Sequence, residues 1–147
     1  MKETTLMDLY DCKVKDYPYN IYVLKVDKTV VYVGRAQDIH ARWFGSFGRL
    51  RKSGNWFRGE STLAKMIWHN PSWNWMLQLW TVKEAARFCG LPSSASLNRV
   101  EIAMIQKLSP VTNGTHNNTY IEIPAFILAY YHKQADIVTS VYDEVMG

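Results

Sequence analysis

The sequence predicts one α+β domain in which a small antiparallel three-stranded sheet is flanked by helices. Residues 20–26 and 30–34 are rich in β-branched and aromatic side chains, which favour strands. Later segments have apolar residues at helical intervals, and several of them follow a residue that can cap a helix. A chain of 147 residues, 48% of them hydrophobic, is sufficient for one core. We therefore expect a single domain over residues 1–147, with its core from about residue 18 to about residue 115.

The first two predicted strands are expected to form an antiparallel hairpin, because only the short polar stretch 27–29 separates them. Side chains alternate between the two faces of a strand. One face of the hairpin is therefore expected to carry Tyr22, Leu24 and Val26 from the first strand and Val30, Tyr32 and Gly34 from the second. This arrangement brings two phenols side by side. Gly34 is expected to end its strand and to permit either a sharp turn or a close approach of the backbone to a phosphate.

Four helices and a third strand are predicted in the rest of the core. Asp38 and Ser61 are candidate N-caps, and the last helix opens either at Ser93-Ser94 or at Ser96 and is ended by Pro110. The expected elements are a helix over 36–50, a helix over 61–68, a strand over 73–81, a helix over 83–89, and a final helix that carries Glu101 next to its apolar stripe.

The tail of the chain, residues 124–146, has apolar side chains at mostly helical intervals and predicts one amphipathic helix. We expect this helix to pack over the domain. A homodimer contact or a docking surface for a partner protein is the alternative.

Five residues that can take part in catalysis follow one another in a recognisable order: Tyr22, Tyr32, Arg42, Glu101 and Asn113. Asn20-Ile21-Tyr22 and Tyr32-Val33-Gly34 are followed by Arg42, and later by Glu101 and Asn113. In order and approximate spacing these residues resemble the GIY-YIG nuclease family, whose name describes two neighbouring strands that each present a tyrosine to one active site. The sequence departs from the family in two places, since Asn20 replaces the first motif's glycine and Ser46 stands where several members have tyrosine or histidine.

The resemblance implies a metal-dependent phosphodiesterase with the GIY-YIG nuclease fold. Glu101 would hold Mg²⁺ or Mn²⁺, hard cations that prefer oxygen ligands and keep several waters. Tyr32 would accept or relay the proton of the attacking water, and Tyr22 would orient Tyr32 or a phosphate oxygen. Arg42 would bind the phosphate and offset charge in the transition state. Asn113 would organise the site.

A basic strip extends from Arg35 to Arg58, and its single acid is Asp38. Such a strip can neutralise phosphates, and each contact adds to the salt dependence of binding. The residues expected to bind nucleic acid in this way are Arg35, Arg49, Arg51, Lys52 and Arg58.

Aromatic residues are interleaved with these cations. Trp43 and Phe47 are expected to pack around the predicted helix. Trp56 and Phe57 lie in the polar, glycine-containing stretch 53–61, where a loop tip that touches nucleic acid is at least as well supported as a buried plug. His40 is the histidine nearest in sequence to the candidate site, and we expect it to be structural.

The predicted function is a metal-dependent DNA endonuclease of restriction, homing or repair type, acting on duplex or branched DNA. The alternative is a catalytically weak module that binds nucleic acid or a protein. The chain has no apolar run of membrane-spanning length and no apolar signal core at its N-terminus, so we expect a cytoplasmic protein without membrane contact. Cys12 and Cys89 lack the spacing of a zinc site.

Overall fold

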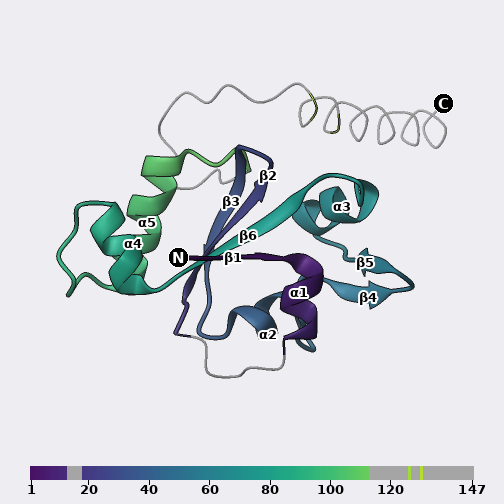
Figure 1. Ribbon diagram of the computed structural model, residues 1–147, viewed down its shortest axis with the longest axis horizontal. Coiled ribbons are helices and arrows are strands. Elements are labelled where there is room, and N and C mark those ends of the chain that lie inside the picture. Colours follow the sequence, from purple (N-terminus) through teal and green to yellow (C-terminus); the bar gives the residue numbers. More distant parts are fainter. Residues whose placement is uncertain (13–17, 113–125, 127–129, 131–147) are drawn as a thin grey trace, which may run out of the picture.

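The computed structural model describes residues 1–12, 18–112, 126 and 130 (Figure 1). Within them the chain forms an α+β fold with a four-stranded antiparallel sheet in the order β1-β6-β2-β3 and a two-stranded sheet of β4 and β5. The strands are β1 Lys2–Thr5, β2 Ile21–Val26, β3 Thr29–Arg35, β4 Arg51–Ser53, β5 Trp56–Arg58 and β6 Trp75–Trp80. The helices are α1 Leu6–Asp11, α2 Ile39–Phe44, α3 Thr62–His69, α4 Val82–Phe88 and α5 Leu97–Leu108.

The main sheet has one strand more than the sequence predicted. Strand β1 pairs with β6 in the register Lys2↔Leu79 to Thr5↔Met76. Its four residues, KETT, are exposed or half-buried and show no alternation of apolar and polar side chains. The strand is therefore held by backbone pairing with a segment more than 70 residues away, which no local pattern announces.

The hairpin of β2 and β3 is confirmed, with a bulge that changes one predicted face. Tyr22 pairs with Gly34 and Leu24 with Tyr32, but Lys25 pairs with Val30, so that Val31 is the extra residue of β3. The prediction that Val30 shares a face with Tyr32 was wrong, because the bulge reverses the alternation at that point.

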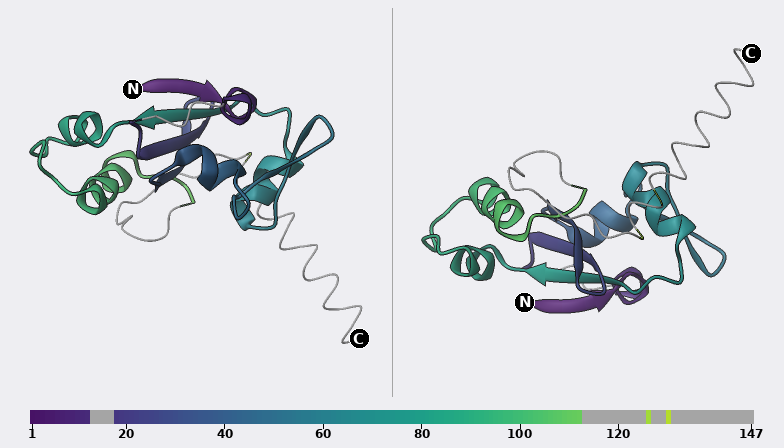
Figure 2. Two further views of the ribbon diagram at one scale, coloured as in Figure 1. Left: turned by 90° about the horizontal axis from the view of Figure 1, so that it is seen from below. Right: turned by 90° about the horizontal axis from the view of Figure 1, so that it is seen from above.

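The main sheet separates two apolar clusters. One lies on the face of Tyr22 and Leu24 and includes residues from α1, α2, α3 and β5, among them Leu6, Trp43, Phe57 and Ile67. The other lies on the face of Ile21 and Val23 and is covered by α4 and α5 through Ala85, Ala86, Val100, Met104 and Ile105. Figure 2 shows α4 and α5 together at one end of the domain, with α3 and the β4–β5 hairpin at the other.

Helix α2 is shorter than predicted. Asp38 caps it as expected, and its carboxylate accepts a hydrogen bond from the Ala41 amide at 3.0 Å. The helix stops at Gly45 instead of continuing to residue 50, and a Cβ there would lie 2.5 Å from the carbonyl oxygen of Ala41. The chain then doubles back, because the Arg49 amide donates to the Arg42 carbonyl at 3.0 Å.

The predicted elements over 61–68, 73–81 and 83–89 agree with α3, β6 and α4 to within two residues, whereas helix α1 and the strands β4 and β5 were not predicted. Ser61 and Ser96 are the N-caps of α3 and α5, and each hydroxyl oxygen accepts a hydrogen bond from the backbone amide three residues later. The final helix thus opens at Ser96, one of the two positions predicted. No helix among residues 1–12 and 18–112 is long and apolar enough to cross a membrane.

Most of the predicted tail helix, and Asn113, lie outside the described residues. Of residues 124–146 the structure describes Phe126 and Tyr130. The Phe126 ring meets Trp73 edge-on at 5.0 Å between centroids, and the Tyr130 hydroxyl lies 3.3 Å from His69 Nδ1. At these two positions the tail contacts the domain.

Candidate active site

The phenol of Tyr22 lies directly over Gly34 on the neighbouring strand. Tyr22 is 1% exposed, and a Cβ added at position 34 would collide with its ring, 2.8 Å from Cε2. The sequence suggested that Gly34 ends its strand, but β3 continues to Arg35. Gly34 lies within β3, where it leaves the space that the Tyr22 ring fills.

Tyr32 lies beside Tyr22 on the same face of the sheet. The two ring centroids are 6.1 Å apart with an angle of 30° between the planes. Trp43 of α2 also packs against Tyr22, with 5.5 Å between the ring centroids. Tyr22 is sealed from solvent, whereas Tyr32 is half-buried. The two phenols predicted to lie side by side do so, but only Tyr32 has access to a ligand.

Arg49 binds both phenols. Its Nη2 donates to Tyr32 Oη at 3.1 Å and, at the longer distance of 3.5 Å, to Tyr22 Oη. Its guanidinium carbon also lies 4.8 Å from the centre of the Tyr32 ring. The sequence assigned Arg49 to the basic strip that is expected to bind nucleic acid. The structure places it half-buried at the tyrosine pair instead, because the turn after α2 returns the chain to that helix.

Arg42 lies close enough to Tyr22 to influence the pKa of that phenol. Burial raises the pKa of Tyr22 above its ordinary value of 10.0, whereas Arg49 and, more weakly, Arg42 lower it. The effect of burial on the pKa is the larger one, so Tyr22 is a neutral phenol near pH 7. Burial lowers the pKa of Arg49, but the two phenols raise it more, so this guanidinium stays charged.

Two buried donors next to the tyrosines have no acceptor among the described residues. They are Arg49 Nε and Trp43 Nε1, and the Arg49 guanidinium lies 5.7 Å from the Trp43 ring centre. A buried N–H without a partner is costly, and native structures contain few of them. Both atoms are themselves buried, so the cost of leaving them unpaired is part of the cost of burying this cluster.

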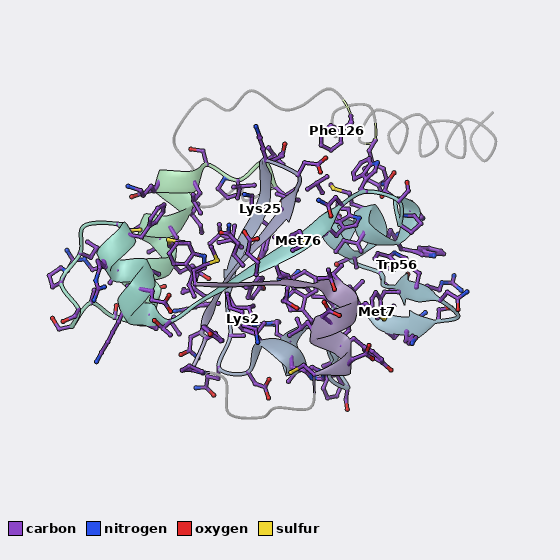
Figure 3. All side chains as sticks on the ribbon, in the orientation of Figure 1. Lys2, Met7, Lys25, Trp56, Met76 and Phe126 are labelled. Carbon is purple, nitrogen blue, oxygen red and sulfur yellow. The ribbon has the colours of Figure 1, made fainter. Side chains whose placement is uncertain are left out.

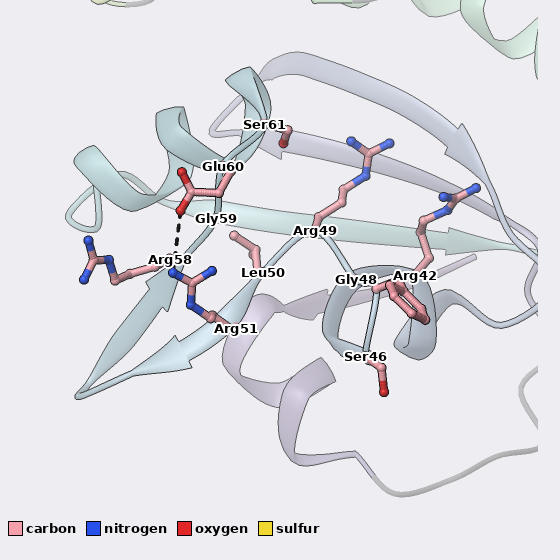
Figure 4. Close-up of a pocket in the computed structure, with 12 residues that line it drawn as sticks. Arg42, Ser46, Gly48, Arg49, Leu50, Arg51, Arg58, Gly59, Glu60 and Ser61 are labelled. Atoms are coloured by element: carbon pink, nitrogen blue, oxygen red, sulfur yellow. Dashed lines mark ion pairs between the residues drawn. The ribbon is translucent and has the colours of Figure 1, made fainter.

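A hollow of about 430 Å³ opens beside this cluster (Figure 4). Its arginines are Arg42, Arg49, Arg51 and Arg58, and the turn 45–48 and residues 59–61 complete the wall. The only acid in this lining is Glu60, whose carboxylate lies 3.5 Å from Arg51. The hollow is therefore a cationic surface, and one of its arginines, Arg49, is hydrogen-bonded to Tyr32. We call it the arginine hollow.

The other two cations of the predicted strip lie elsewhere. Lys52 Nζ is 5.2 Å from the centre of the Tyr10 ring, and Lys52 is not part of the arginine hollow. Arg35 Nε lies 3.8 Å from Glu101 Oε1 on α5. The basic strip is thus divided by the fold, and three of its five predicted nucleic-acid contacts line the hollow.

Glu101 lies at the open end of the β2–β3 hairpin, where β2 begins and β3 ends. The side chain is 19% exposed, and its ion-pair partner Arg35 directly follows Gly34 and pairs across the sheet with Ile21, the neighbour of Tyr22. The residues around Glu101 on α5, however, pack on the face opposite to Tyr22. In the described ranges, 1–12 and 18–112 with residues 126 and 130, no group of three or more His, Cys, Asp or Glu could hold a metal.

A divalent ion at Glu101 would therefore take its other ligands from water and from substrate oxygens, an arrangement that Mg²⁺ accepts. The carboxylate suits a hard cation, and its ion pair with Arg35 is longer than a hydrogen bond.

The exposure of the aromatic residues in the strip differs in part from the prediction. Trp43 is fully buried as predicted, but Phe47, expected to pack, is fully exposed. Phe57, for which a loop tip and a buried plug were both open, is buried, because residues 51–58 form the β4–β5 hairpin against α3. Trp56 is half-buried where β5 meets α3 (Figure 3), and its Nε1 donates to the Ile67 carbonyl at 3.2 Å.

Asn20 and His40 have structural contacts. The Asn20 amide nitrogen donates to the Ala36 carbonyl at 3.0 Å and so ties the start of β2 to the chain after β3. His40 Nε2 lies 3.2 Å from the Tyr10 carbonyl, which links α2 to α1.

No protein-family model, curated protein or solved structure matches this chain.

Proposed function

We propose that this protein is a divalent-metal-dependent DNA endonuclease of GIY-YIG type. The observation that carries the proposal is the pairing of Tyr22 and Tyr32 on adjacent strands, with both phenols hydrogen-bonded to Arg49, which also lines the arginine hollow. A phosphodiester has both parts that this surface complements: anionic oxygens for the arginines and a reacting centre for a proton-transferring hydroxyl.

The two tyrosines have different roles in this proposal. Tyr22 is sealed and neutral, so it orients its neighbours. Tyr32 is accessible, and its oxygen accepts a hydrogen bond from a cation. The phenol oxygen that accepts the proton of the attacking water must be a phenolate beforehand, and the Arg49 cation stabilises that negative charge. Tyr32 is therefore the residue that exchanges a proton with the attacking water.

The arginines of the hollow bind the substrate. Arg42 stands on the last turn of α2, on the same side as Arg49 in Figure 4, and a guanidinium presents donors in a geometry that matches phosphate oxygens. Glu101 would hold the metal ion, which when bound polarises the phosphate and stabilises the leaving oxygen.

One observation favours the second candidate, a catalytically weak nucleic-acid-binding module. Glu101 already has a cationic partner in Arg35, and this pairing opposes binding of a second cation. In that case the arginine hollow would bind nucleic acid while the tyrosine pair served only to hold Arg49.

A plasmid-nicking assay distinguishes the two functions. Supercoiled DNA is incubated with the protein and Mg²⁺, Mn²⁺ or EDTA, and nicked and linear products are measured. The endonuclease predicts metal-dependent products that disappear with Glu101→Gln. DNA binding without products in either metal would leave the binding module as the function.

A further inference from the structure

Phe47 is the most exposed large apolar side chain among the described residues. Its relative exposure is 102%, against 49% for Met1 and 39% for Phe88 and Phe126. A single exposed apolar residue is ordinary on a protein surface. The surroundings of Phe47 are what distinguish it.

The turn that carries Phe47 is tightly constrained. The Gly45 amide donates to the Ala41 carbonyl at 2.8 Å, and the Gly48 amide donates to the Gly45 carbonyl at 2.9 Å. A Cβ at Gly48 would lie 2.7 Å from the Trp43 carbonyl oxygen, so the chain at this point requires glycine. The phenyl ring is thus presented to solvent by backbone that is hydrogen-bonded back onto α2.

The same turn forms part of the arginine hollow. Phe47 lies in its lining together with four arginines and one acid, and that acid is paired with Arg51. An aromatic ring beside a cationic groove is the combination by which proteins bind single-stranded nucleic acid, since phosphates follow the cations and bases stack on the ring. A protein partner with an apolar patch would not require this excess of arginine.

We propose that Phe47 stacks on an unpaired base and that the preferred substrate is therefore DNA with unpaired nucleotides next to the bound phosphate. In a perfect duplex each base face is already covered by its neighbours, so an unpaired base is the one that offers a free face. This inference rests on the proposed function, and it names the DNA structure that the arginine hollow selects.

The test measures binding by fluorescence anisotropy to three labelled DNAs of equal length. One is a perfect duplex, one has a single bulged base, and one has an abasic site in place of that base. We expect Phe47→Ala to weaken binding of the bulged DNA by roughly tenfold or more. Binding of the duplex and of the abasic DNA should change less than twofold, and Phe47→Trp should retain the preference for the bulge.

Phe88→Ala is the matched control. Phe88 is also an exposed phenylalanine, but it ends α4 at the other end of the domain, and its ring centre lies 4.7 Å from Lys107 Nζ. The Phe88→Ala substitution should leave the binding of all three DNAs unchanged. A 2-aminopurine placed in the bulge provides a direct signal, because stacking on Phe47 should quench its fluorescence in the wild type and not in Phe47→Ala.

Equal binding of the bulged DNA by wild type and Phe47→Ala would overturn the stacking role while leaving the proposed function intact. An equal loss on all three DNAs would also overturn it, because the ring would then act without reading an unpaired base. If the wild type binds none of the DNAs, both the inference and the proposed function fail.

Discussion

The Tyr22 ring occupies the space in which a side chain at position 34 would lie. The two residues are paired across β2 and β3, and the phenol reaches over Gly34 towards Arg49. The absence of a side chain on one strand therefore determines where the hydroxyl on the other strand lies. The hydroxyl is thereby placed at the cation that also binds Tyr32.

Gly34→Ala is expected to destabilise the fold by displacing this ring. A methyl group has no room, and forced overpacking typically costs about 1–3 kcal/mol. Chemical denaturation measures the loss. In a Tyr22→Ala background the same Gly34→Ala change should cost little, because the colliding ring is gone. Equal costs in both backgrounds would show that the strain has another source.

Arg49→Ala is expected to reduce the single-turnover cleavage rate by roughly a hundredfold or more, the usual scale for loss of a charge-stabilising group. Arg49→Lys keeps the charge but loses the planar guanidinium that reaches both phenols, so its rate should also fall. Arg87→Ala on α4 is the control for the loss of one positive charge. A near-normal rate in Arg49→Ala would remove Arg49 from the mechanism.

Glu101→Gln should abolish cleavage and leave DNA binding largely intact, since it removes the proposed metal ligand and little of the basic surface. Arg35→Ala provides the opposite change, because it releases the carboxylate from its ion pair. Half-maximal activity should then require less Mg²⁺ than in the wild type. Substantial cleavage by Glu101→Gln, or an unchanged Mg²⁺ requirement in Arg35→Ala, would contradict the assignment of Glu101.

The arginine hollow should contribute to the salt dependence of DNA binding. Replacing Arg51 and Arg58 with alanine removes two lining cations and is expected to flatten the slope of log K against log salt by about 1.8 for duplex DNA. The control pair, Lys83→Ala with Arg87→Ala, removes the same charge from α4. Identical slopes for the two double variants would place the DNA elsewhere.

Stability should fall at alkaline pH through Tyr22. Burial raises the pKa of this phenol in the folded state above the ordinary value of 10.0. The unfolded chain therefore loses the Tyr22 proton first, and the stabilising effect is complete below about pH 10 and decreases as the pH rises further. Urea unfolding at pH 9 and pH 11 measures the decrease. Tyr22→Phe should show a smaller decrease, and an equal one would contradict the assignment.

Several features of the fold and of the candidate site followed from sequence alone. The β2–β3 hairpin, the caps at Asp38 and Ser61, and the adjacency of Tyr22 and Tyr32 were all predicted and are present in the structure. These features depend on residues close together in the chain, where side-chain alternation and capping act directly. The metal, the DNA substrate and the roles of Arg42 and Glu101 remain predictions from the resemblance.

The tertiary structure alone decided the remaining features of the site. The additional strand β1, the position of Arg49 at the two phenols, and the full exposure of Phe47 were not predicted. Each depends on contacts between segments that are distant in the chain or on the point at which a helix ends. Residue type sets the chemistry a side chain can perform, but packing between distant segments determines which arginine reaches the tyrosines and which aromatic ring faces solvent.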